Sequence, residues 1–135
     1  MRVKCIANTK QAVDAQYRAA LDEYFGDDQL FLEIGKSYDV YGLAFRRGHL
    51  WYLVSVEDEF DYPYLHLSAF FSVEDARIPP GWALTTQMNN LEAGTSILPA
   101  PWASDPYFME RLVDEDEVAI AFFRELKKNG GAVNS

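Results

Sequence analysis

The amino-acid sequence predicts a mainly β domain with added helices, of the α+β class, and three observations lead to that prediction. Residues 32–41 alternate apolar and polar side chains with the two-residue period of a strand that buries one face. Residues 50–56 form a second apolar run, and the turn sequence Arg46-Arg47-Gly48 lies between the two runs. Residues 104–129 instead carry helix start and stop signals.

Length and composition favour a single domain over residues 1–135. The chain has 135 residues, of which 49% are apolar and 15% aromatic. A chain of this length buries roughly two-thirds of its unfolded surface. Twelve Lys and Arg against 21 Asp and Glu give a net charge of −9. This balance disfavours direct nucleic-acid binding, because phosphate contacts need a large Lys and Arg surface.

A cytoplasmic location is expected, because neither a signal peptide nor a membrane span is predicted. No apolar run of signal-peptide length follows Met1 to Lys4, and no window approaches the ~20 apolar residues of a membrane helix. Cys5 is the single cysteine, so an internal disulfide is impossible. Its apolar neighbours Val3 and Ile6 predict a buried thiol rather than a nucleophile or a metal ligand.

Residues 1–86 are expected to form the β core, with a helical insertion at about residues 10–25. Residues 3–6 are predicted to form the first strand, and Asn8 and Thr9 to end it. The apolar stripe of the inserted helix consists of Val13, Tyr17, Leu21 and Tyr24.

Beyond the hairpin, the acidic residues 57–63 are expected to form an exposed connection that ends at a proline. Residues 64–73 resume β character, and the pair Phe70 and Phe71 breaks the alternation, which indicates a bulge or a strand end. Pro79-Pro80-Gly81 predicts a turn before a last strand over residues 82–86.

The C-terminal part is predicted as an ordered loop over residues 87–103 and helices over residues 104–129. Two abutting helices are expected, at about residues 106–112 and 115–128. Asp114 is the predicted N-cap of the second helix, whose Phe122 and Leu126 would dock on the sheet. The expected core of the β part consists of Val3, Ile6, Ile34, Tyr38, Val40, Trp51, Leu53, Leu65 and Phe70.

Motifs for catalysis or metal binding are missing from the sequence. It contains no Gly-rich phosphate loop, no Cys and His pair at metal spacing, and no nucleophile elbow. His49 and His66 are the two candidate general bases, but neither has a Ser or Cys nucleophile beside it. The sequence therefore predicts no catalytic residue, no metal site and no cofactor.

The acidic connection and the aromatic residues around it are each open to more than one interpretation. The connection is a solvated turn, or its Asp58, Glu59 and Asp61 bind a cation or contact a basic protein partner. The aromatic side chains Trp51, Tyr52, Tyr62 and Tyr64 are either core residues at strand spacing or a binding platform beside it. The residues of the candidate contact surface are Glu57, Asp58, Glu59, Asp61, Tyr62 and Tyr64.

Several short segments resemble a set of small bacterial and phage-borne proteins. The resemblance is carried by Val3-Lys4-Cys5-Ile6-Ala7-Asn8, by residues 34–40, by residues 50–54 and by residues 64–71. It implies a Src-homology-3-like small β-barrel over about the first seventy-five residues. Residues 108–114 look like the helical extension of longer members. This chain departs from the shortest phage forms by inserting residues 9–29 between the first two strands.

The resemblance carries no catalytic residue over, and some members of the set resemble immunity or accessory proteins of mobile and toxin loci. Two classes of function follow. The first is a non-enzymatic acidic binding module, of immunity or antitoxin type, that binds a basic partner protein. The alternative is a small-molecule-binding protein or enzyme, with a pocket between the barrel and the C-terminal helices that is lined by Trp82, Trp102 and Tyr107.

Overall fold

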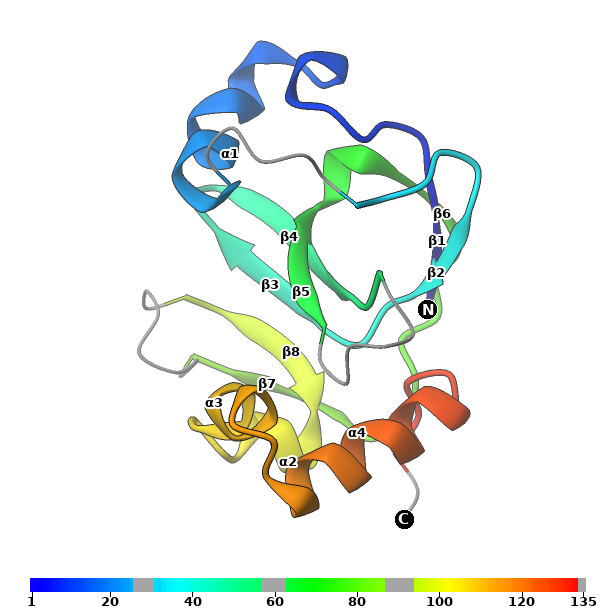
Figure 1. Cartoon of the computed structure of the whole chain (residues 1–135), viewed down its shortest axis with the longest axis vertical. Helices are drawn as coiled ribbons and strands as arrows, with labels where there is room; N and C mark the ends of the chain where they lie inside the picture. The colour runs from blue at the N-terminus through cyan, green and yellow to red at the C-terminus, as the bar shows by residue number, and fades with distance from the viewer. Residues whose placement is uncertain (26–30, 57–62, 87–93, 134–135) are drawn as a thin grey trace.

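The structure, a computed structural model, describes residues 1–25, 31–56, 63–86 and 94–133. Within these ranges the chain forms two antiparallel sheets, with one helical segment at the top of Figure 1 and three helices at the bottom. The predicted α+β class is confirmed. The two sheets, as described, do not join into one closed barrel.

The three-stranded sheet has the order β2-β1-β6, with β1 (Arg2–Cys5) in the middle, β2 (Ser37–Asp39) on one side and β6 (Phe71–Asp75) on the other. Val3 and Cys5 are buried on one face of β1, as the period of two requires.

Two members of the predicted core are wrong. Ile6 is 54% exposed, because Val3 and Cys5 point inward and a residue one position later must point outward. Ile34 is 64% exposed, because it lies in a turn closed by the bond from Lys36 N–H to the Glu33 carbonyl. Gly35 follows it with a φ of 91°, which a type II turn requires at that position.

The insertion after β1 consists of two 3-10 turns (Lys10–Ala12 and Ala15–Tyr17) and the helix α1 (Arg18–Phe25). It covers the upper end of the sheets in Figure 1. Val13 and Leu21 of the predicted stripe are buried, and the Tyr17 ring packs edge to face against His49 at 4.9 Å between centroids.

The predicted first arm of the hairpin, residues 32–41, is wrong. The strand found within it, β2, pairs with β1 in the other sheet, and the strand that leads into the hairpin turn is β3 (Leu43–Arg46). β3 begins after Gly42, where a Cβ would lie 2.6 Å from Leu98 Cδ2. β3 pairs with β4 (His49–Val54) through a two-residue turn, in which Arg47 has a φ of 55° and Gly48 a φ of 76°. The hairpin turn is therefore where the sequence predicts it.

The five-stranded sheet has the order β5-β4-β3-β8-β7. β5 (Tyr64–Leu67) leads through the 3-10 turn Ser68–Phe70 into β6, so the interruption predicted at Phe70 and Phe71 is confirmed. β7 (Trp82–Thr85) is the strand predicted after the Pro-Pro-Gly turn. Where the sequence predicts only a loop, over residues 87–103, the structure places β8 (Ser96–Pro99) and α2 (Ala100–Ala103).

Two longer helices follow α2, namely α3 (Phe108–Val113) and α4 (Glu117–Lys128). The N-cap of α4 is Asp116 and not the predicted Asp114, because the Asp116 carboxylate accepts the Ala119 N–H at 2.9 Å. Glu115, with a φ of 60°, ends the turn between the helices, so a helix cannot begin at that residue.

The core is one continuous cluster that extends from both sheets to the helices. Phe71 of β6 meets the rings of Tyr38, Tyr52 and His66, which joins the two sheets. Leu65 and Phe122 are only partly buried. The predicted core and docking residues found to be buried are Val3, Tyr38, Val40, Trp51, Leu53, Phe70 and Leu126.

Candidate functional site

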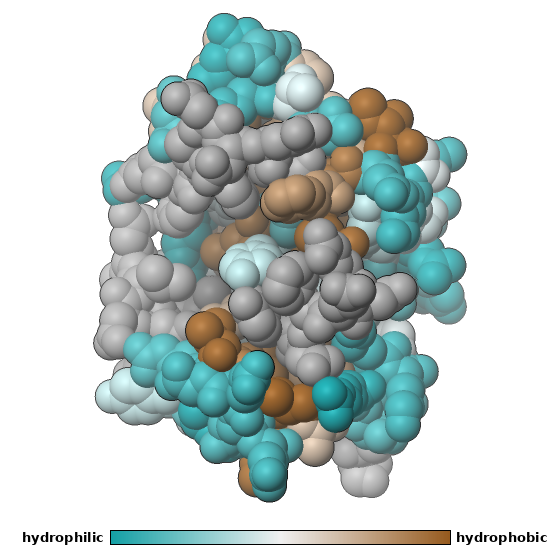
Figure 2. Space-filling view, in the orientation of Figure 1, coloured by the Kyte–Doolittle hydropathy of each residue, from teal (hydrophilic) through white to brown (hydrophobic). Residues whose placement is uncertain are grey.

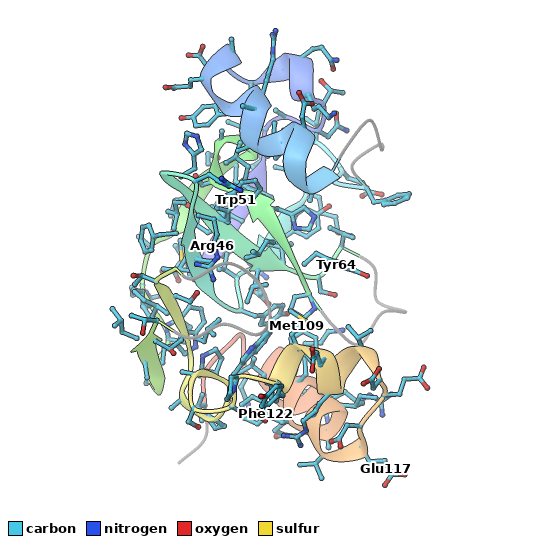
Figure 3. All side chains as sticks on the ribbon, turned by 90° about the vertical axis from the view of Figure 1, so that its left-hand side faces the viewer. Arg46, Trp51, Tyr64, Met109, Glu117 and Phe122 are labelled. Carbon is cyan, nitrogen blue, oxygen red and sulfur yellow. The ribbon has the colours of Figure 1, made fainter. Side chains whose placement is uncertain are left out.

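Tyr64 is the one residue of the predicted contact surface that lies within the described ranges. Glu57, Asp58, Glu59, Asp61 and Tyr62 lie outside them. Tyr64 is the first residue of β5 and is 48% exposed. Figure 3 places it at the lower end of β5, on the side of the sheet that faces α3 and its Met109.

The backbone around Tyr64 is held in place by the pairing of β5 with β4 and by the buried residue that precedes it. Tyr64 pairs with Val54 of β4, which is completely buried, and the preceding Pro63 is buried as well. The Tyr64 carbonyl lies 3.0 Å from Nδ1 of His66, two residues later on the same strand. An exposed aromatic side chain on a well-anchored strand is suited to binding, because the backbone is already ordered and loses little conformational freedom when a partner docks.

Trp51 and Tyr52, which the sequence offered as further members of an aromatic platform, are buried in β4. The indole of Trp51 donates a hydrogen bond to the Arg46 carbonyl at 3.1 Å. Both side chains therefore belong to the core, and a surface around Tyr64 does not include them.

The two histidines occupy different surroundings. His66 is buried between β4 and β6, and burial lowers its pKa from 6.5 to about 4, although its contact with the Tyr64 carbonyl opposes that shift. Its ring is therefore neutral at pH 7. His49 lies at the start of β4 and is half-buried against Tyr17.

Within the described ranges, no three His, Cys, Asp or Glu side chains gather closely enough to hold a metal ion. The Cys5 thiol is buried as predicted, and its Sγ donates to the Ala7 carbonyl at 3.2 Å. Burial raises the pKa of this thiol, which keeps it protonated and a poor nucleophile.

The three predicted pocket residues do not form the lining of one open pocket in the structure. Trp102 is buried, with its ring centroid 4.7 Å from that of Phe108, and Phe108 in turn meets Phe122. The Trp82 indole donates to the Gly131 carbonyl at 2.7 Å, while Tyr107 is exposed. Both indoles are thus used to pack β7 and α2 against the rest of the C-terminal part.

A buried cation, Arg46 at the end of β3, is a feature that the sequence did not predict. Its guanidinium donates to the hydroxyl of Ser96 on β8 at 3.2 Å and to the backbone carbonyls of Thr95 and Phe45. Gly94 is required beside it, because a Cβ there would lie 2.3 Å from Arg46 Nη1. Because Arg46 and Arg47 are adjacent, the sequence does not indicate which of the two is buried. Arg46 joins β3 to β8.

Figure 2 shows a surface that is largely hydrophilic over the described residues, with separate hydrophobic patches near the upper right and where the sheets meet the helices. No helix within the described ranges combines the length and the apolar character needed to cross a membrane.

Comparisons with known proteins give no match: no family model fits the chain, and neither the curated proteins nor the solved structures include one that is significantly similar.

Proposed function

We propose that this protein is a non-enzymatic binding module, of immunity or antitoxin type, whose partner is a basic protein. The observation that carries the proposal is the exposed Tyr64 at the start of a well-anchored strand, directly after an acidic segment of the chain. The proposed contact surface consists of Glu57, Asp58, Glu59, Asp61, Tyr62 and Tyr64.

Charge and aromatic surface have separate parts in this proposal. Four carboxylates within five residues, in a chain of net charge −9, attract a basic partner and raise the rate of encounter. A tyrosine beside them supplies a large contact area at a low cost in side-chain entropy, and such residues often account for most of the binding energy. Tyr64 is therefore expected to act mainly on dissociation, and the acidic residues mainly on association.

We also propose that the first seventy-five residues have a Src-homology-3-like connectivity. The segment over β2 and β3 contributes to both sheets, with a bend at Gly42 between its halves. A single 3-10 turn links the end of β5 to β6. Both features support this connectivity, to which β7, β8 and the C-terminal helices would be an addition at the edge of β3.

The experiment begins with affinity purification of the partner on the wild-type chain, followed by kinetics with the purified partner. The triple variant Asp58→Ser, Glu59→Ser and Asp61→Ser should slow association about tenfold at low salt and flatten its salt dependence. Tyr64→Ala should leave association nearly unchanged and speed dissociation.

A control with the same change in charge is Asp114→Ser, Glu115→Ser and Glu117→Ser, at exposed positions in the turn after α3 and at the first residue of α4. This control should affect association much less than the first triple variant does. Equal on-rates and salt slopes for both triple variants, or a partner that is acidic, would contradict the proposed surface.

A further inference from the structure

The five-stranded sheet has two outer strands, β5 and β7. β5 begins at the proposed contact surface, whereas β7 lies at the opposite edge of the same sheet. In Figure 3, β7 is the strand at the left-hand margin, with no described segment beyond it. The properties of β7 are independent of the proposed function.

The backbone of β7 has a defined outward side. Ala100 N–H donates to the Gly81 carbonyl at 2.8 Å, and the register places these two residues opposite each other. Hydrogen-bonded pairs recur every second residue in an antiparallel ladder, so Ala83 and Thr85 direct their backbone groups toward β8. Leu84 must then direct its N–H and its carbonyl away from β8.

The pairing on the other side of β8 leads to the same result. Phe45 N–H donates to the Thr95 carbonyl at 2.8 Å, so by the same alternation Ile97, two residues on, bonds to Leu43 of β3. Ile97 stands opposite Leu84 on β7, but its backbone groups are already used by β3. The outward groups of Leu84 have no recorded partner among the described residues.

The side chains in the row that ends at this edge are apolar, and their exposure increases toward β7. Leu84 is 66% exposed and stands in one row with Ile97, which is half-buried, and Leu43, which is buried. Phe45, two residues along β3 from Leu43, lies on the same face and is 47% exposed. An apolar stripe therefore runs across the face of the sheet and ends at the open strand.

Most of the devices that protect edge strands are missing from β7. Proteins commonly place a Lys or a Pro in such a strand, or cover it with another segment. Residues 78–91 contain no charged side chain, and β7 contains no proline. Among the described C-terminal residues, positions 131 and 133 bond to the beginning of this segment: Val133 N–H donates to the Pro80 carbonyl and the Trp82 indole donates to the Gly131 carbonyl.

We propose that β7 pairs antiparallel with β7 of a second copy of this chain, about a two-fold axis at Leu84. In that register each Leu84 exchanges two backbone hydrogen bonds with its counterpart, and the two exposed leucine side chains cover each other. The two five-stranded sheets become one continuous sheet.

The local lack of charge permits a second copy to occupy this edge. A chain of net charge −9 repels itself over most of its surface, and β7 lies in the longest stretch of the sequence without charged residues. A charged partner would find no ion pair there, whereas an identical strand offers the same apolar row and the same outward backbone groups.

Cysteine cross-linking tests both the pairing and its register. Opposed residues of a hydrogen-bonded pair have Cα atoms about 5.5 Å apart, which a disulfide spans. Leu84→Cys should therefore form a covalent dimer under mild oxidation, while Cys5 does not interfere because it is buried. Thr86→Cys should stay monomeric, because the register offsets the two copies of residue 86 by four residues, which places them about 14 Å apart.

Val118→Cys, at an exposed position on α4, measures the background of random collision. Cross-linking of Leu84→Cys at no more than this background would overturn the proposal, and so would equal cross-linking of Thr86→Cys.

Sedimentation equilibrium tests the same pairing without a covalent bond. The wild-type chain should show a concentration-dependent dimer, Leu84→Lys should be monomeric, and Val118→Lys should dimerise like wild type. Circular dichroism checks that both variants are folded. A wild-type chain that is monomeric at about 1 mM, or a folded Leu84→Lys variant that still dimerises, would contradict the pairing.

Discussion

Trp51 illustrates how a single side chain stabilises the centre of this protein. It is fully buried in β4, stands opposite Ala44 of β3 and Leu67 of β5, and donates its indole N–H to the Arg46 carbonyl at 3.1 Å. Its large side chain is part of the core, and its one polar atom is satisfied by the backbone of the neighbouring strand.

We expect Trp51→Ala to lower the free energy of unfolding by about 3–5 kcal/mol, because it leaves a large cavity and removes a buried hydrogen bond. Chemical denaturation followed by circular dichroism measures this loss. Phe45→Ala, at a half-exposed position on β3, is the control and should cost about 1 kcal/mol or less. A loss at Trp51 no larger than at Phe45 would contradict the burial of Trp51.

His66 predicts a pH dependence of stability. Its pKa is about 4 in the folded chain and 6.5 when unfolded, so between these pH values the unfolded chain binds a proton that the folded chain does not. Stability should therefore fall as the pH drops from 6.5 to 4, by at most about 3 kcal/mol.

His66→Gln should remove most of that slope, and denaturation midpoints at half-unit pH steps measure it. His49→Gln is the control, because His49 is only half-buried. The upper part of the pH window is the most informative, because Asp116 has a lowered pKa and contributes its own loss of stability only at more acidic pH. Identical pH profiles for wild type and His66→Gln would show that His66 is not the cause.

At the scale of the elements, the junction between α3 and α4 is organised by Arg111. Its guanidinium bonds to Asp105, before α3, and to Asp116, the cap of α4, at 3.2 Å. These two carboxylates raise the pKa of Arg111, while the Ala119 N–H and then Arg111 lower the pKa of Asp116. Glu115 makes the sharp turn possible through its positive φ.

Glu115→Gly should stabilise the protein by about 0.5–1 kcal/mol, because glycine adopts a positive φ without the clash that a Cβ causes. Ala121→Gly, in the middle of α4, is the matched control and should destabilise by about 1 kcal/mol. Thermal unfolding of the two variants distinguishes the effects by their opposite signs. A loss of stability in both would indicate that Glu115 has a helical backbone.

At the scale of the whole molecule, aromatic contacts join the C-terminal helices to the sheets. Phe123 of α4 is buried and meets Tyr41, between β2 and β3, with 5.1 Å between ring centroids. Leu98 of β8 also approaches Gly42 closely. The two parts of the chain therefore share one core and are expected to unfold together.

Phe123→Ala should cost about 3–5 kcal/mol and lower the midpoint of the sheets and of the helices equally. Tryptophan fluorescence, which follows Trp51 and Trp82 on the five-stranded sheet and Trp102 on α2, and circular dichroism at 222 nm, which follows the helices, provide two probes of the same transition. Transitions that separate in the variant, with the helices unfolding first, would show two independent cores.

Local sequence patterns were sufficient for the elements that depend on neighbouring residues. The hairpin turn at Arg47 and Gly48, the strand after Pro79-Pro80-Gly81 and the two C-terminal helices follow from turn residues, helix signals and apolar periodicity, which act over a few residues. The burial of Cys5 and Trp51 follows from the same patterns.

Features that depend on distant residues were missed. β8 is short and contains a proline, and it becomes a strand because β3 and β7 lie on either side of it. Ile34 is apolar but exposed, because it lies in a turn that is tied to β1 by the hydrogen bond from Gly35 N–H to the Cys5 carbonyl at 2.8 Å. Burial of Arg46 rather than Arg47 requires Ser96, fifty residues later, as its partner.

The candidate surfaces follow the same division. The acidic segment and its tyrosines are visible in the sequence, because charge and aromatic character are properties of single residues. The position of Leu84 on an outer strand of the described sheet is not visible in the sequence, because an exposed leucine and a buried one are the same residue there. Which backbone groups remain without a partner depends on the order of the strands in the sheet, and that order results from contacts between segments far apart in the chain.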